Sequence, residues 1–279
     1  MNIIEILKVI VLGIVEGFTE WLPISSTGHL ILINNIIKLD VPDSFMEMFR
    51  VVIQLGAILA VIVMYFRKLN PWSSRKKPEQ KKATWMLWGK IIVSCIPAGV
   101  LGVLLNDWMD AHFYNGIVVA IMLILYGVLF IVIENRNRFT TPVISRTGQI
   151  SYQTALYIGM FQVLSLIPGT SRSGATILGA MILGCSRAVS AEYSFFLGIP
   201  VMFGASLVKL IKFGPHFTGP EMFYLILGMV VAFLVSIYSI QFMMSWIKKN
   251  NFKFFGYYRI VLGVVVLIWY LISSLVGVH

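Results

Sequence analysis

Two acids, a run of hydroxyls and one histidine interrupt a strongly apolar region near the start of the chain. They belong to EGFTEWLPISSTGH, residues 16–29, which we call the first polar segment. Ionisable groups at membrane depth cost roughly 2.5–3.5 kcal/mol each even on a lenient scale, so they usually face a cavity and have a function there. The first polar segment is therefore a candidate site for chemistry.

The two acids of this segment, Glu16 and Glu20, are four positions apart and so share one face of a helix. Two adjacent carboxylates repel each other unless a cation or a proton lies between them. Hard oxygen ligands favour Mg²⁺ or Ca²⁺, which also bridge phosphate oxygens. The alternatives are that the pair is protonated, or that it pairs with Arg172 in a purely structural role.

Hydroxyl groups and a histidine follow Pro23. Ser26 and His29 are three positions apart, which is close enough on a helical turn for a nucleophile and its base. Hydroxyls after a break also cap the next helix by accepting hydrogen bonds from its free N–H groups. Catalysis and capping thus both remain open for Ser26, while Ser25 and Thr27 are candidates for substrate binding.

A second polar segment, PGTSRSGAT at residues 168–176, interrupts the other half of the chain. Arg172 follows a proline and lies at a predicted helix start. An arginine fork, hydroxyl donors and the free N–H groups of a helix N-terminus form an anion pocket, which suits phosphate best. The alternative is an interfacial charge or a local ion pair. The expected binding residues beside Arg172 are Thr170, Ser171, Ser173 and Gly174.

The composition limits the architecture that must position these two segments. Of the 279 residues, 58% are hydrophobic and 12% are charged, whereas average globular proteins are about 25% charged. Long continuous apolar runs exclude the alternating pattern of a barrel. The net charge of +10 comes mostly from short loops between spans, so it does not indicate nucleic acid as a partner. We predict an all-α polytopic protein with one integral membrane domain, residues 1–279.

Six stretches have the roughly 20 residues that a membrane-spanning helix needs. They are Phe45–Phe66, Thr84–Leu105, Asn115–Glu134, Ala188–Ile211, Glu221–Ser245 and Gly256–Val276. The two polar segments lie instead in apolar stretches that break at Pro23 and Pro168. Each predicts two short helices forming a re-entrant hairpin, whose broken backbone lines a cavity.

An internal repeat is indicated because an offset of 146 residues places Ser25 on Ser171 and Gly28 on Gly174. Each half of the chain, 1–140 and 141–279, would be a hairpin followed by three spans. An odd number of crossings inverts the second half, so the two breaks would meet near the midplane. The basic loop 67–82 is predicted to be cytoplasmic, so the first hairpin would enter from outside.

The motifs EGFTEWLPISSTGHL and PGTSRSGATI closely resemble the two signature motifs of undecaprenyl-diphosphate phosphatases, the bacitracin-resistance type of bacterial membrane phosphatase. The similarity extends over the whole chain. It implies hydrolysis of undecaprenyl diphosphate to undecaprenyl phosphate and inorganic phosphate, which recycles the lipid carrier of cell-wall synthesis. It also implies a divalent cation, and a site open to the outer face of the bacterial cytoplasmic membrane.

The resemblance also implies roles for single residues. Glu16 and Glu20 would be the acids that bind the metal, with Glu20 the more direct contact to the cation. Ser26 and His29 would supply the nucleophile and the acid or base, and Arg172 would bind the diphosphate. The sequence leaves open whether Ser26, His29 or water attacks phosphorus. It also leaves open whether the protein forms a homodimer.

A transporter or flippase of a lipid phosphate is the rival class. Inverted repeats whose broken helices meet at the midplane are a transporter arrangement. Glu16, Glu20 and His29 would then relay protons while Arg172 holds an anionic cargo. The motifs favour hydrolysis.

Overall fold

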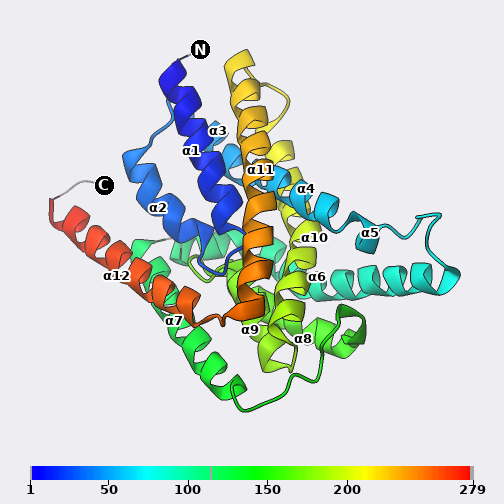
Figure 1. Ribbon diagram of the computed structural model, residues 1–279. Helices are drawn as coiled ribbons and strands as arrows, with labels where there is room; N and C mark the ends of the chain where they lie inside the picture. Colours follow the sequence, from blue (N-terminus) through cyan, green and yellow to red (C-terminus); the bar gives the residue numbers. More distant parts are fainter. Residues whose placement is uncertain (1, 114, 277–279) are drawn as a thin grey trace.

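The computed structural model describes residues 2–113 and 115–276 (Figure 1). Within these residues every regular element is a helix, apart from one isolated β-bridge between Ile144 and Cys185. The elements in chain order are α1 (Ile3–Thr19), α2 (Ser26–Ile36), α3 (Asp43–Val52), α4 (Gln54–Met64), α5 (Phe66–Leu69), α6 (Pro78–Phe113), α7 (Gly116–Asn137), η1 (Thr147–Gln149), α8 (Tyr152–Val163), η2 (Leu164–Leu166), α9 (Arg172–Ile182), α10 (Arg187–Phe213), α11 (Gly219–Lys249) and α12 (Lys253–Val276).

Six segments of the described chain are long and apolar enough to cross a membrane, which confirms the six predicted spans. Their bounds are Asp43–Met64, Pro78–Leu105, Gly116–Asn137, Arg187–Phe213, Gly219–Lys249 and Lys253–Ser274. The first of them is not one continuous helix, because α3 and α4 meet at Ile53. There the Gly56 N–H bonds to the Ile53 carbonyl at 3.0 Å, which tightens the backbone to a three-residue turn.

Large apolar side chains cover the outside of these helices. Val103, Leu104 and Ile211 are 80%, 71% and 71% exposed, respectively, and many other leucines, isoleucines and valines are about half exposed. Contiguous exposed apolar surface of this extent is unusual for a protein in water. It is the surface expected of a protein whose solvent is lipid.

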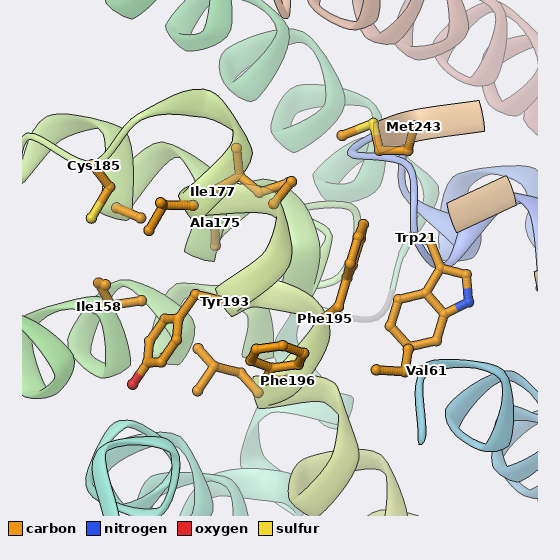
Figure 2. Packing of buried hydrophobic residues seen from close by; sticks show 14 of the residues in the cluster. Trp21, Val61, Ile158, Ala175, Ile177, Cys185, Tyr193, Phe195, Phe196 and Met243 are labelled. Atoms are coloured by element: carbon orange, nitrogen blue, oxygen red, sulfur yellow. The ribbon is translucent and has the colours of Figure 1, made fainter. Parts of the chain in front are cut away.

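The interior joins the two polar segments through a common hydrophobic core. Trp21 and Leu22 from the first segment pack in one cluster with Ala175 and Ile177 of α9. Figure 2 shows the Trp21 ring beside Val61 of α4, with the aromatic residues of α10 next to it. Residues about 150 positions apart in sequence therefore share one packed region.

Close helix contacts depend on glycine. The most extensive helix–helix contacts join α12 with α7, α1 with α11, α4 with α11 and α6 with α8. A Cβ on Gly56 of α4 would overlap the backbone of Met229 in α11, and a Cβ on Gly159 of α8 would overlap the backbone of Ser94 in α6. Small residues that allow backbones to approach are the usual means of packing helices in lipid.

We predict that Gly56→Ala destabilises the fold by about 1–3 kcal/mol, because overpacking forces the helices apart. Thermal unfolding of the purified protein in detergent would measure the change. Gly99→Ala in α6 is the matched control, since a Cβ there meets open space, and it should be neutral or up to about 1 kcal/mol stabilising. Equal melting temperatures for the two variants would contradict the packing argument.

Candidate active site

The two polar segments turn the chain in the same way. Ser25 has φ of 71° and Ser171 has φ of 70°, and they are the only non-glycine residues with positive φ in the described chain. Each hydroxyl accepts a hydrogen bond from the third residue of the following helix, Gly28 at 3.4 Å and Gly174 at 3.2 Å. Such conformations cost of order 1–3 kcal/mol each and cluster at functional sites.

The turns aim two helix N-termini into the interior. Helix α2 begins directly after Ser25 and α9 directly after Ser171. The hydroxyl of Ser173 donates to the carbonyls of Glu20 and Leu22, both at 3.2 Å, so the first turn of α9 contacts the first polar segment. Helix N-termini carry free N–H groups and partial positive charge, which favours anions.

A buried ion pair joins the two segments. Arg172 donates from Nη2 and Nε to Oε1 of Glu20 at 3.1 and 3.3 Å, and the two side chains are only 10% and 9% exposed. The structure thus brings together two residues that the sequence analysis assigned to opposite sides of one site. Glu20 has an ion-pair partner here, which is the structural alternative considered for the acids.

Other groups fix the orientation of the arginine. Its Nη1 donates to the Ser194 carbonyl of α10 at 2.8 Å. Its guanidinium lies 5.6 Å from the centre of the Trp21 ring, which in turn packs edge-on against Phe195 (Figure 2). A guanidinium over an indole face gains a further electrostatic attraction. Arg172 is therefore held in one direction by Glu20, Trp21 and Ser194.

Ser26 belongs to the same cluster, whereas His29 lies beside it with other partners. The Ser26 hydroxyl donates to Oε2 of Glu20 at 3.3 Å. His29 bonds through Nδ1 to the Ser25 carbonyl and through Nε2 to the Tyr258 hydroxyl, both at 2.7 Å. The predicted nucleophile is thus next to a carboxylate. The side chain of Thr27 lies outside the described part of the chain.

Glu16 is enclosed in the interior. It is 0% exposed, and the polar side chains close to its carboxylate are those of Gln54 and Glu20. The Glu20 N–H bonds to the Glu16 carbonyl at 3.0 Å, so the two acids follow one helical turn, as predicted. Carboxylate oxygens buried close to a second carboxylate fit a bound cation or proton between them.

Thr170 and the glycine of the second segment are also placed. Thr170 is fully buried, and its hydroxyl lacks a partner in the described residues. The Ser171 and Ser173 hydroxyls lie 3.1 Å apart. The Gly174 N–H is used by its cap, so the free donors of α9 lie in the residues before it.

Two functional candidates were not found from sequence. Tyr258 holds His29, and Arg259 is 0% exposed and contacts carbonyls of both polar segments. Both are in α12, more than 80 residues from either segment. A signal existed for Arg259, since an arginine inside a predicted span is itself a functional-site indicator. For Tyr258 there was none, because tyrosines are common at membrane interfaces.

An apolar groove leads to the histidine. Its volume is about 400 Å³, and it runs between α1, α11 and α12 with His29 and Tyr258 in its wall. Thr19 and Leu22, which flank Glu20 in sequence, line it with Phe242. Such a groove has the lining expected for a hydrocarbon chain attached to a polar head.

The fold and site define a multi-pass α-helical membrane protein with a buried polar centre, and comparison with known proteins gives the family. Residues 9–265 match the family model described as bacitracin resistance protein BacA. A relative from Desulfitobacterium hafniense is 59% identical over 99% of this chain and 100% of its own length. Relatives from Enterococcus faecalis and Acetivibrio thermocellus are 57% and 58% identical, covering 95% and 96% of this chain and 98% of each relative. All three are named undecaprenyl-diphosphatase. The chain belongs to the BacA family.

We predict that Glu20→Gln lowers the free energy of unfolding by about 3 kcal/mol or more, because it leaves Arg172 buried without a countercharge. The double variant Glu20→Gln/Arg172→Met should lose less than the sum of the two single losses. Unfolding in mixed detergent measures all three. Glu47→Gln is the control, because its partner Lys209 is 3.7 Å away and Glu47 is 71% exposed. Strictly additive losses would show that the pair is not coupled.

Proposed function

We propose that this protein hydrolyses undecaprenyl diphosphate to undecaprenyl phosphate and inorganic phosphate. The observation that carries the proposal is the buried cluster of Ser26, Glu20 and Arg172 between two helix N-termini. The cluster offers a hydroxyl nucleophile beside a carboxylate and an arginine fork for phosphate oxygens. The names of the relatives identify the lipid diphosphate on which such a site acts in this family.

The diphosphate binds where positive groups converge. Arg172 exchanges part of its pairing with Glu20 for phosphate oxygens, because a guanidinium binds either group bidentately. The free N–H groups that begin α9 and the Ser171 hydroxyl supply further donors. Ser173 adds another only when its hydroxyl leaves the carbonyls of Glu20 and Leu22. Stabilisation of charge as it develops on the transferred phosphoryl group accounts for most of the catalysis expected of such a site.

Ser26 is the nucleophile that the geometry favours. Its oxygen forms a bond to the terminal phosphorus while the bond from that phosphorus to the bridging oxygen breaks, and undecaprenyl phosphate leaves. The hydroxyl proton passes to Oε2 of Glu20, to which it already donates at 3.3 Å. Water then cleaves the phosphoserine and releases inorganic phosphate. For His29 to act as nucleophile or base instead, it must leave Ser25 or Tyr258.

A divalent cation, Mg²⁺ or Ca²⁺, fits the acids of this site. Glu16 and Glu20 would be the protein's ligands. The described chain has no group of three or more His, Cys, Asp or Glu side chains placed for a metal, so the remaining ligands would come from substrate and water. The position of the Glu16 carboxylate, fully buried and close to Glu20, supports this assignment. Mg²⁺ commonly takes one or two carboxylates together with substrate phosphates and water. Once bound, the cation would neutralise phosphate charge.

The lipid chain of the substrate occupies the apolar groove beside His29. Its walls are largely apolar, and two of its lining residues, Thr19 and Leu22, lie within two positions of Glu20 in sequence. A polyprenyl chain there remains continuous with surrounding lipid while its head reaches the buried cluster. Because the surrounding lipid tails are as apolar as the groove, the chain enters it from the bilayer at little cost.

The two hairpins are re-entrant, and the halves 1–140 and 141–279 are an inverted repeat. This part of the proposal is supported by the matching turns at Ser25 and Ser171 and by second arms of 11 residues in both α2 and α9. The basic loop 67–82 supports a cytoplasmic location for the end of α4, and hence a site open to the outer face of the inner membrane. Transport of the lipid phosphate has no separate support beyond this symmetry.

We predict that the purified protein in detergent releases phosphate from undecaprenyl diphosphate when Mg²⁺ or Ca²⁺ is present. Ser26→Ala, Glu20→Ala and Arg172→Ala should each lower kcat/KM by about a hundredfold or more, while Glu47→Gln should resemble wild type. A malachite-green phosphate assay would measure all five proteins. Folded wild-type protein without activity would reject the proposed reaction. Full activity in the presence of a chelator would reject only the cation requirement and leave the proposed reaction standing.

A further inference from the structure

Arg259 of α12 is a charged residue enclosed in the apolar interior. Its side chain is 0% exposed, and no carboxylate pairs with it within the described residues. A buried charge is expensive unless hydrogen bonds satisfy all of its donors. A buried arginine in this position therefore needs a specific set of hydrogen-bond acceptors for its N–H groups.

Those acceptors are backbone carbonyls from both polar segments. Nη1 of Arg259 donates to the carbonyl of Pro23 at 3.1 Å, and Nη2 donates to those of Gly169 and Thr170 at 2.9 Å. Longer contacts of 3.5 Å reach carbonyls of α7, and the guanidinium lies 5.4 Å from the centre of the Tyr126 ring. One side chain thus touches both breaks at the same time.

These carbonyls need a donor because each break leaves the helical hydrogen-bond pattern. Water is scarce in the interior of a membrane protein, so a carbonyl without a hydrogen-bond donor is costly there. A guanidinium carries five N–H donors in a rigid planar fork. An ammonium is a compact group with three donors and cannot span the same acceptors.

We propose that Arg259 is a positioning residue, whose guanidinium fixes the first break against the second and thereby sets the distance from Ser26 to Arg172. Pro23 precedes the Ser25 turn by two residues, and Thr170 directly precedes the Ser171 turn. Holding both carbonyls therefore holds the starts of α2 and α9 in register. The inference deepens the proposed phosphatase function and rests on it.

A different role would be electrostatic, in which the positive charge of Arg259 attracts the diphosphate directly. The two roles differ in what lysine can replace. Lysine keeps the charge but loses the fork, so it would preserve an electrostatic role and would not preserve a positioning role. The two roles also differ in the kinetic constant that they affect. Arg172 still binds the substrate in both cases, so loss of positioning lowers kcat, whereas loss of an electrostatic attraction raises KM.

The experiment compares Arg259→Lys and Arg259→Met with wild type and with Arg187→Lys as a matched control. Arg187 pairs with Glu134 and contacts neither break. Two experiments are made on folded protein. The first measures kcat and KM for phosphate release from undecaprenyl diphosphate, and the second measures hydrogen exchange of segments 22–28 and 168–174. Arg259→Lys keeps charge and stem, so it serves even where Arg259→Met fails to fold.

Positioning predicts that Arg259→Lys lowers kcat about a hundredfold with little change in KM, and speeds exchange in both segments together. The Arg187→Lys control should leave all of these near wild type. Wild-type kcat and exchange in Arg259→Lys would overturn the proposal, as would a rise in KM in Arg259→Met that lysine restores. If wild-type protein shows no hydrolysis, the reaction is wrong, and the exchange data alone then show whether Arg259 holds the two breaks.

Discussion

The buried ion pair between Glu20 and Arg172 is the interaction on which the arrangement of the two breaks depends. Neither charge is tolerable alone in an apolar interior, so each requires the other segment to be in place. The pair spans 152 positions in sequence and lies within one packed core with Trp21 and Phe195. In the proposed reaction, the arginine that Glu20 neutralises is also the group that binds phosphate.

Broken helices impose a second constraint, which is the supply of partners for backbone groups that a continuous helix would satisfy. The serine caps at Ser25 and Ser171 accept from N–H groups, and Arg259 donates to the carbonyls on the other side of each break. Glycine contacts such as Gly56 against Met229 keep the surrounding helices close enough for these bonds. The result is an interior in which hydrogen-bond donors surround both breaks, as the proposed binding of a diphosphate requires.

Hydropathy predicted the six spans, and the polar interruptions predicted the two segments that differ from ordinary spans. Both predictions were possible because polar groups are costly in lipid, so membrane-spanning helices need long apolar runs that are visible in the sequence. The partners within the site were less accessible to sequence reasoning. Ser26 was paired with His29 by spacing, whereas it donates to Glu20, and His29 contacts Tyr258, 229 residues away. The break at Ile53 and the contacts of Arg259 likewise depend on tertiary packing, which spacing along the chain does not encode.

The most direct test of the account is whether both breaks respond to one ligand. Hydrogen exchange of segments 22–28 and 168–174 would be compared with and without a methylene-bridged polyprenyl diphosphonate, which binds but cannot be hydrolysed. The account predicts slower exchange in both segments at the same ligand concentration, because the phosphate groups contact the starts of α2 and α9 together. Protection of only one segment, or of neither at saturating ligand, would contradict a single shared site.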